Sequence, residues 1–507
     1  MRTLRGLAAV SAGILFLACG DSGGDGGGGG PTLAISPAGA TVTAGGTAAF
    51  TATLTGSTDT INWSLTPAGV GSIAPTSGPN TTYTAPASVA GATSVTLTAT
   101  AGSLTRSVTI TVNPPATITV SGKVVAGNGQ PVANAPVVIT GRPSTISDAN
   151  GDFTVTGVTT PYDLTAVVSS IKLAVVYKGL TRTDPTIFFF AFSPPLANSA
   201  TLSGKVTGGA AVPAPPFYTK VAFGSPDATD TESATWVAPD LTYAFSPITW
   251  FGPVSTTGTL HALQWRATSS TNPPNLYSGY GQKTGVTISN GGTFANQDVP
   301  MTAVTPANLD GTVTVPTGYT LAAKAMSVNF SDGASIAILN DATATAAFNY
   351  LTPAISGSTM AVSATASTAA SELTATTRTN LSASATGVGV TLQPAPVLSL
   401  PVNAATNVGY GQSFSWTAFA GGVHMVVFNG PAGQPDYFVF TGGTSTAIPD
   451  LSSEGLGLPA SAAYTWGIYG IAPVASVDAL AGQSQLLPSG DSAYIGLSAT
   501  RTFTTAP

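Results

Sequence analysis

The sequence predicts an all-β protein, a tandem array of small β-sandwiches. From residue 32 onward the chain is rich in Thr, Val, Ser, Ala and Gly. Short runs that alternate apolar and polar residues are interrupted by Gly or Pro about every ten residues, which is the spacing of sandwiches and barrels. No apolar stripe with helical period and capping residues accompanies them. The 507 residues leave room for three or four domains of about 150 residues, or for more if the β modules are small.

Composition excludes several classes of function. Only 7% of the residues are charged, against about 25% in an average globular protein. The net charge of −6 provides no basic surface for nucleic acid. The single cysteine rules out a disulfide framework and a cysteine-based zinc site, and two histidines leave little material for acid–base chemistry. We therefore expect no enzyme activity, no cofactor and no metal.

The first 18 residues are predicted to be a signal peptide. Arg2 and Arg5 precede an apolar stretch, residues 7–17, that has the length of a signal-peptide core and is too short to span a bilayer. The stretch runs into the sequence LACG at 17–20, which resembles a bacterial lipobox. The resemblance implies cleavage before Cys19 and a lipid on that residue. An ordinary secretory signal with an incidental cysteine is the alternative.

Residues 19–31 are predicted to be a tether, because glycine-rich chains are flexible coils. The tether contains GDSGG at 20–24, which matches the serine motif of chymotrypsin-like proteases. That motif has meaning only on a rigid turn with a His and an Asp around it. His261 and His424 lie far downstream, so we expect no catalytic role for the tether.

Residues 32–114 are the first expected sandwich. A Gly-Thr turn precedes the strand that holds Phe50, a lone Trp63 stands in a central strand, and the sequence YTAP follows at 83–86. These features resemble bacterial Ig-like domains. The resemblance implies that Trp63 packs between the two sheets.

Residues 116–196 are the second expected sandwich. They contain SGKV at 121–124, PVANAPV at 131–137, SDANGDF at 147–153 and PYDL at 161–164. Together these segments resemble the carboxypeptidase regulatory-like domain, a transthyretin-like sandwich. The resemblance implies a fold and no peptidase activity.

The same segment raises a calcium alternative. Asp148, Asn150 and Asp152 resemble the start of a calcium loop, but Gly151 precedes the third ligand and the loop lacks its final glutamate. Asn150 and Gly151 both tolerate positive φ, which favours a hairpin turn. A turn is therefore the preferred interpretation.

Two further sandwiches are expected at 197–304 and 305–394. Their opening strands, ATLSGKV at 200–206 and LDGTV at 309–313, echo the SGKV of the second sandwich. We predict that both are divergent transthyretin-like sandwiches.

Residues 395–507 are the last expected sandwich. A strand with Trp416 and a later strand with Tyr464 and Trp466 resemble the core strands of a fibronectin type III domain. His424 lies on an apolar strand between them, where a core or edge role is the simpler interpretation.

Aromatic side chains crowd into the third sandwich and are the candidate ligand-binding residues. Exposed rings stack on sugar faces and dominate binding surfaces. Gln264, Arg266, Asn275 and Gln282 would supply polar contacts. The alternative is that the rings are simply strand residues of the core. The candidates are Trp236, Tyr243, Trp250, Trp265, Tyr277 and Tyr280.

Taken together, these features predict a non-enzymatic exported lipoprotein for cell-surface adhesion or binding, or a modular spacer in the form of an extended rod. Its partners would be the membrane, through the lipid on Cys19, and glycans or surface proteins. The expected location is the outer membrane or cell surface of a Gram-negative bacterium. A carbohydrate-binding protein that uses an aromatic face in 236–280 is one alternative. An accessory protein of a secreted hydrolase system is another.

Overall fold

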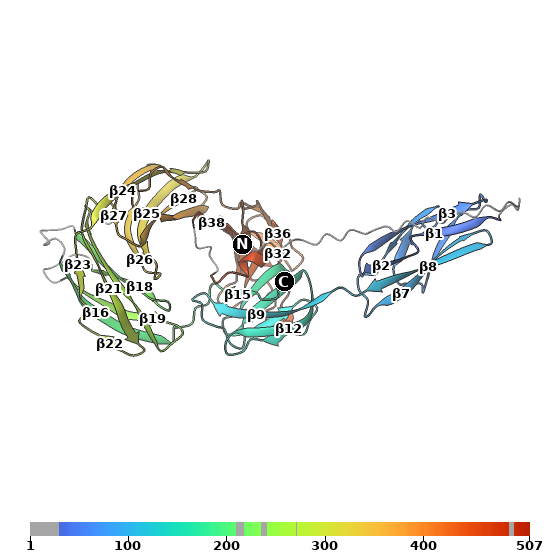
Figure 1. Cartoon of the computed structure of the whole chain (residues 1–507), viewed down its shortest axis with the longest axis horizontal. Helices are drawn as coiled ribbons and strands as arrows, with labels where there is room; N and C mark the ends of the chain where they lie inside the picture. Colours follow the sequence, from blue (N-terminus) through green and yellow to red (C-terminus); the bar gives the residue numbers. More distant parts are fainter. Residues whose placement is uncertain (1–29, 209–216, 235–240, 270, 486–490) are drawn as a thin grey trace, which may run out of the picture. The chain divides into compact units, whose positions relative to one another are not determined.

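The computed structural model describes residues 30–208, 217–234, 241–269, 271–485 and 491–507. In these ranges almost all regular structure is β-strand, which confirms the all-β prediction (Figure 1). The exceptions there are one short helix and two 3-10 turns, α1 (Val477–Leu480), η1 (Ser169–Ile171) and η2 (Ser452–Glu454). The chain divides into two compact units, Met1–Ala116 and Thr117–Pro507.

The first unit holds one sandwich of two four-stranded sheets. Its strands are β1 (Thr32–Ser36), β2 (Gly39–Thr43), β3 (Thr47–Thr55), β4 (Asn62–Thr66), β5 (Ser72–Ala74), β6 (Asn80–Thr84), β7 (Thr93–Ala101) and β8 (Leu104–Asn113). The sheet orders are β1-β3-β6-β5 and β2-β8-β7-β4. Alternation along each strand turns valine, leucine and isoleucine inward and threonine outward. Trp63 and Phe50 are buried in this core.

The second unit begins with a seven-stranded sandwich, called here the second sandwich. Its strands are β9 (Thr117–Ala126), β10 (Pro136–Ile139), β11 (Thr145–Ile146), β12 (Asp152–Thr159), β13 (Tyr162–Val168), β14 (Leu173–Leu180) and β15 (Thr186–Phe189). The sheet orders are β12-β9-β15 and β11-β10-β13-β14.

The third and fourth sandwiches follow in the same unit. The third has β16 (Asn198–Gly208), β17 (Phe217–Gly224), β18 (Thr229–Ala234), β19 (Thr242–Trp250), β20 (Ser255–Arg266), β21 (Leu276–Ser289), β22 (Thr293–Phe294) and β23 (Val299–Met301). The fourth has β24 (Thr305–Thr314), β25 (Thr320–Phe330), β26 (Ser335–Asp341), β27 (Ala347–Ala354), β28 (Ser358–Ser367), β29 (Leu373–Leu381) and β30 (Val388–Thr391).

The second, third and fourth sandwiches share one topology. In each, the opening strand pairs with an antiparallel partner on one side and a parallel partner on the other, giving β12-β9-β15, β19-β16-β22 and β27-β24-β30. The facing sheets also correspond: β11-β10-β13-β14, β18-β17-β20-β21 and β26-β25-β28-β29. The three sandwiches therefore have the same strand order.

A glycine opposite an aromatic residue recurs in the opening strand of all three. Gly122 pairs with Phe153, Gly204 with Tyr243, and Gly311 with Phe348. A Cβ at any of these glycines would collide with the backbone of the neighbouring parallel segment. The glycines that echo one another in the sequence are therefore required for close strand approach.

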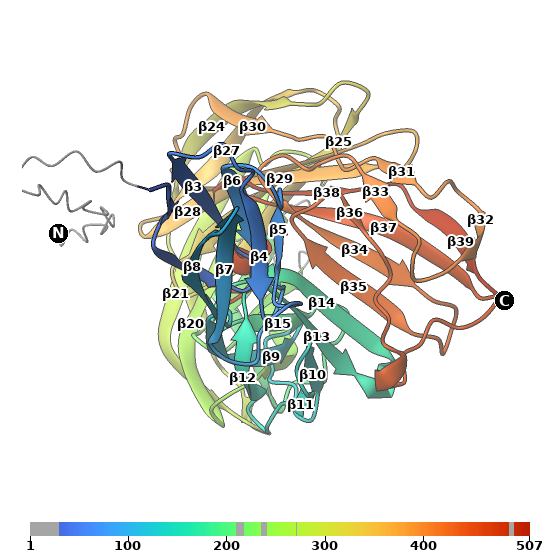
Figure 2. The same ribbon diagram turned by 90° about the vertical axis from the view of Figure 1, so that its right-hand side faces the viewer.

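The last sandwich pairs with strands of the second and fourth sandwiches. Its strands are β31 (Leu398–Leu400), β32 (Ala405–Val408), β33 (Phe414–Trp416), β34 (Val423–Asn429), β35 (Asp436–Thr441), β36 (Ser445–Thr446), β37 (Ala463–Ala472), β38 (Ala493–Leu497) and β39 (Arg501–Thr505). Strand β35 pairs in parallel with β14, and β38 pairs antiparallel with β29. Figure 2 shows β35 beside β14 and β38 beside β29.

These two pairings create one continuous sheet that runs through the second, last and fourth sandwiches. The hydrophobic cores are shared as well, since core residues of the second sandwich pack with Met425 and Phe440 of the last. Core residues of the fourth sandwich likewise pack with Trp265 and Tyr277 of the third. The expectation of an extended rod is therefore wrong for residues 117–507, because strand pairing between edges joins modules that a rod would keep apart.

Candidate functional site

Four of the six candidate aromatic residues lie in the core. Tyr243, Trp250, Trp265 and Tyr277 are 4%, 1%, 2% and 5% exposed. The indole of Trp250 donates to the Pro253 carbonyl at 2.8 Å. A ring enclosed in this way cannot stack on a sugar, so the predicted aromatic binding face is not present at these four positions. Alternation along the strands turns the rings inward.

The two remaining candidates differ from these four. Trp236 lies outside the described residues. Tyr280 is half-buried on β21 and retains access to solvent. Among the described candidates, Tyr280 is therefore the one available for a ligand.

Tyr280 belongs to a chain of three hydrogen-bonding side chains. Its hydroxyl lies 2.8 Å from Nδ1 of His261 on β20, and Nε2 of His261 lies 2.8 Å from Oδ2 of Asp332. His261 is 5% exposed. The ring of Phe330 stacks on the imidazole with 3.8 Å between ring centroids.

Sequence reasoning missed this cluster because its members come from different sandwiches. Asp332 stands in the turn between β25 and β26 of the fourth sandwich, 71 residues after His261. Neither histidine has an acidic residue close to it in sequence. The available signal was the turn sequence SDG at 331–333, but nothing local relates that turn to β20.

The electrostatics of the cluster keep Tyr280 a neutral hydroxyl. Burial, and then the negative charge of Asp332, raise the pKa of the Tyr280 phenol. The second carboxylate oxygen of Asp332 accepts from the Ala334 amide at 3.1 Å. The cluster thus holds Tyr280 in a fixed position as a neutral hydroxyl.

Tyr280 also lines a pocket of about 300 Å³, called here the junction pocket. The pocket lies where β21 of the third sandwich meets the start of β24 and the end of β27 in the fourth. Its lining residues are Tyr280, Gln282, Thr302, Ala303, Val304, Thr305, Ala354, Ile355 and Ser356. No charged side chain is among the described residues that line it.

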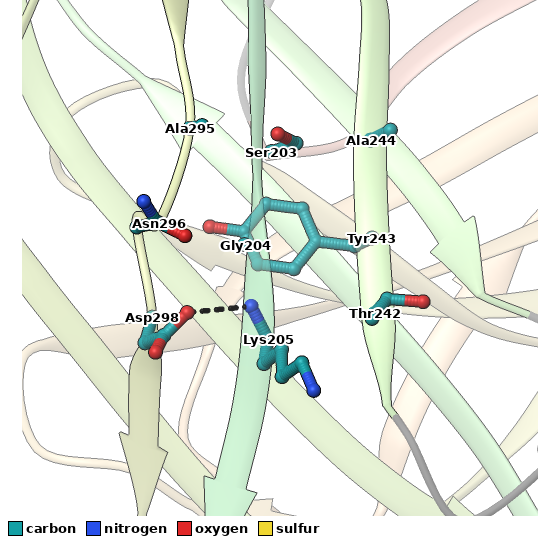
Figure 3. Close-up of a pocket in the computed structure, with 9 residues that line it drawn as sticks. All are labelled: Ser203, Gly204, Lys205, Thr242, Tyr243, Ala244, Ala295, Asn296 and Asp298. Carbon is teal, nitrogen blue, oxygen red and sulfur yellow. Dashed lines mark hydrogen bonds between the residues drawn. The ribbon is translucent and has the colours of Figure 1, made fainter.

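A second pocket, of about 500 Å³, surrounds Gly204 (Figure 3). Figure 3 shows the ring of Tyr243 reaching from β19 across Gly204 of β16. The Tyr243 hydroxyl donates to the Gln297 carbonyl, and the Lys205 amide donates to Asp298 at 2.9 Å. Tyr243 is buried and held by its hydrogen bond to Gln297, which is a packing role.

His424, the other histidine, is a core residue. It is 1% exposed, and its Nε2 accepts from the Phe419 amide at 3.0 Å. Burial lowers the pKa of His424, so the imidazole is neutral at neutral pH. This position fits the structural role expected for it from the sequence.

The calcium alternative at 148–152 finds no support in the geometry. Oδ1 of Asp148 accepts from the amides of Asn150 and Asp152, at 2.8 and 2.9 Å. The ammonium of Lys123 binds Asp152 and the Asn150 carbonyl. A bound cation would compete with that ammonium, so the segment is a turn held by its own hydrogen bonds.

Two features of the N-terminal segment cannot be placed in the structure. Cys19 and the GDSGG segment lie outside the described residues. Within those residues, no group of three or more His, Cys, Asp and Glu side chains could hold a metal ion. No helix in the described ranges is long and apolar enough to cross a membrane.

Comparison with known proteins assigns this chain to no family. No family model and no curated protein matches the sequence. The pilus adhesin SpaC from Lactobacillus rhamnosus GG, in its open conformation, is 11% identical with a TM-score of 0.18, over 78% of this chain and 55% of the adhesin. A three-Ig fragment of titin is 13% identical with a TM-score of 0.16, over 52% of this chain and 98% of the fragment.

An alpha-2-macroglobulin from Salmonella is 9% identical with a TM-score of 0.17, over 95% of this chain and 46% of the macroglobulin. The chain thus spans about half the length of the adhesin and of the macroglobulin. At such scores these likenesses carry no argument about function. The chain is a protein of β-sandwiches, and its function is to be argued from its own residues.

Proposed function

We propose that this chain is a non-enzymatic exported lipoprotein that acts in adhesion or binding at the outer membrane or cell surface of a Gram-negative bacterium. Lipid on Cys19 would hold it, and the glycine-rich segment would act as its tether. The sandwich of residues 32–113 would serve as a spacer. Residues 117–507 would be the body that meets the partner.

One observation carries this assignment of roles. The first sandwich is a compact unit of its own, whereas four sandwiches are joined into the second unit by strand pairing and shared cores. A single sandwich between an anchor and a larger body would increase the distance between that body and the membrane. A body whose modules are joined edge to edge keeps its surfaces in fixed relation, which lowers the entropy cost of binding.

The composition supports a role at the surface. Outward positions on the first sandwich are mostly threonine and serine, as on β7 and β8. Such a surface forms hydrogen bonds with water mainly through hydroxyl groups, because it carries few charged side chains. Binding by the body would therefore rest on hydrogen bonds and shape more than on charge, and it would depend little on salt.

The anchor is tested by metabolic labelling with an alkyne-tagged fatty acid in cells that express the full chain. We expect label on the wild type and none on Cys19→Ser. Ser22→Ala is the matched control, since it alters the same segment outside the lipobox. Absence of label on the wild type, or label that persists in Cys19→Ser, would refute the anchor.

Adhesion is tested with the same cells. Cells that carry the wild-type chain should attach to glycan-coated or protein-coated surfaces more than vector cells, and whole-cell protease treatment should remove both the chain and the attachment. Attachment equal to that of vector cells on every coating would refute the adhesion role.

A further inference from the structure

We propose that the junction pocket binds a neutral saccharide, with the Tyr280 hydroxyl as its central hydrogen-bonding group. This inference names a ligand class for the surface-binding function proposed above and rests on that function. It is carried by the lining of the pocket, by the side chains that hold Tyr280, and by the meeting of two sandwiches at this point.

The lining is polar and uncharged. Hydroxyl groups come from Tyr280, Thr302, Thr305 and Ser356, and an amide comes from Gln282. Each hydroxyl can donate and accept, and the amide offers both kinds of group. A sugar hydroxyl also donates and accepts, so the lining matches a polyol. A phosphate or carboxylate would require a cation that the described lining does not supply.

Aliphatic side chains complete the wall. Val304 and Ile355 line the pocket beside the polar groups. Sugar rings carry C–H faces as well as hydroxyls, and a few polar groups set among apolar ones is the usual composition of a ligand site. The volume of about 300 Å³ is at the small end of the ligand-pocket range of roughly 300–1,000 Å³. It fits one sugar unit of a longer chain.

Tyr280 is held in position before any ligand arrives. The imidazole of His261 is hydrogen-bonded to its hydroxyl, and Asp332 is hydrogen-bonded to the imidazole. The ring of Phe330 stacks on the same imidazole. A ligand that meets this hydroxyl does not have to order it, which preserves binding free energy.

Asp332 orients the imidazole. A carboxylate oxygen accepts, so Nε2 of His261 donates to Oδ2 of Asp332. Nδ1 lies 2.8 Å from the Tyr280 oxygen, and that oxygen keeps a lone pair for a donor in the pocket whether Nδ1 donates a proton or accepts the phenolic proton. Oε1 of Gln282, 3.3 Å from the same oxygen, is the alternative acceptor for that proton. Tyr280 thus offers an acceptor to a sugar hydroxyl.

The pocket walls are joined across the two sandwiches. Nζ of Lys220 on β17 donates to the Ala337 carbonyl on β26 at 2.8 Å, and the Tyr277 hydroxyl donates to the Leu351 carbonyl on β27 at 3.0 Å. Because these bonds span the same junction as His261 and Asp332, the shape of the pocket is fixed by packing. A bound sugar would in turn stabilise the junction.

The test uses the full chain, purified from membranes in detergent. An array of neutral oligosaccharides, with sialylated and uronic-acid glycans beside them, identifies the ligand, and calorimetry with the best neutral glycan gives the affinity. Tyr280→Phe removes the hydroxyl and keeps the ring. Ser356→Trp fills the pocket from an exposed position without touching His261. Tyr469→Phe, in the last sandwich, is the matched control.

We expect the wild type to bind at least one neutral glycan. Tyr280→Phe should lower the affinity about tenfold, the effect of losing one well-placed hydrogen bond, and Ser356→Trp should abolish binding. Tyr469→Phe should bind as the wild type does. If Tyr280→Phe also lowers the thermal unfolding temperature, its loss of affinity is not interpreted, and the affinity of Ser356→Trp tests the pocket. Binding restricted to anionic glycans, no glycan bound, or unchanged affinity in Ser356→Trp would overturn the proposal.

Cell attachment separates this inference from the broader function. If cells with Ser356→Trp attach as well as wild-type cells and the purified variant keeps its glycan affinity, the pocket assignment fails and the adhesion role stands. If wild-type cells do not attach while the purified chain binds a neutral glycan that Ser356→Trp loses, the pocket assignment stands and the adhesion role fails.

Discussion

Gly311 on β24 lies directly opposite Phe348 on β27, and the aromatic ring occupies the space that a side chain at Gly311 would need. A Cβ added to Gly311 would lie 2.6 Å from a ring carbon of Phe348 and still closer to the Val388 carbonyl of the parallel strand. The same relation joins Gly122 with Phe153. Gly204 likewise lies opposite Tyr243, but there the Gln297 backbone is nearest to an added Cβ. Three sandwiches thus share a glycine paired with an aromatic residue, and in the second and fourth the ring fills the space beside the glycine.

Gly311→Ala should therefore destabilise the second unit. Overpacking a well-filled site costs about 1–3 kcal/mol, measured here as a lower midpoint in chemical unfolding. Gly389→Ala is the control, because Gly389 lies on β30 of the same sheet and its added Cβ meets nothing within 4 Å. Equal midpoints for the two variants would contradict the close packing of Phe348 against Gly311.

The buried pair of Lys324 and Asp341 makes a second prediction. Nζ of Lys324 lies 3.1 Å from Oδ2 of Asp341, and the two residues are 1% and 5% exposed. The same Nζ donates to the Thr343 and Thr345 carbonyls. Lys324→Met leaves the carboxylate buried without its cation, which costs about 3–5 kcal/mol. Chemical unfolding should show this loss, and adding Asp341→Leu should recover part of it.

The lowered pKa of Asp341 leads us to expect a smaller free energy of unfolding in acid. Burial alone would raise the pKa of Asp341, but hydrogen bonds from Thr343, Tyr350 and Lys324 outweigh it and lower the pKa. A carboxyl with a lowered folded-state pKa stabilises the fold above its unfolded value of about 3.9, and the contribution disappears as pH falls further. Asp341→Asn should reduce stability at pH 6 and flatten its decline below pH 4. An unchanged acid slope would argue against this role.

Asp478 joins the last sandwich to the second. Its carboxylate accepts from the amides of Thr181 and Arg182, at 2.7 and 2.9 Å, and burial alone would raise its pKa, but these bonds lower it. Asp478→Ala should cost about 1–2 kcal/mol after allowance for solvent screening. It should also speed hydrogen exchange in β14 and β35. Asp184→Ala removes an exposed salt bridge to Arg182 and should leave that exchange unchanged.

The lowered pKa of His424 leads us to expect a second pH dependence of stability, just below neutral pH. Burial lowers its pKa, so the folded protein binds this proton less readily than the unfolded chain, whose histidine has a pKa of about 6.5. Stability should be fully present above that value and decline as pH falls below it. His424→Gln keeps an acceptor near the Phe419 amide and should remove the slope between pH 7 and 5. A slope that survives in His424→Gln would assign the effect to another group.

Strands and core residues could be predicted along most of the chain because alternation is a local property. Each run of apolar residues with period two marks its own inward face, whatever it pairs with. Trp63 is different, because its core position is implied by the resemblance to Ig-like domains; it is buried in the structure. The aromatic residues of the third sandwich were ambiguous, because a strand of the core and a strand of a binding face have the same alternation.

The candidate site could be predicted only in part. Tyr280 and Gln282 were among the candidates, since aromatic and amide side chains suggest sugar binding. Asp332 and Phe330 were not, because their relation to His261 depends on how two sandwiches pack. The echo of SGKV was visible in the sequence, whereas the aromatic partner of each glycine depends on strand register, which no local pattern specifies.

Local sequence was thus sufficient for the all-β class, for the run of sandwich-forming segments, and for the prediction of an anchor at Cys19. Tertiary structure alone revealed that residues 117–507 form one body and that a pocket exists at the junction of two sandwiches. The reason is physical: an edge strand such as β14 has the same sequence pattern whether it faces water or pairs with β35. Its partner is chosen by the packing of whole sandwiches, and this packing also brings His261 to Asp332.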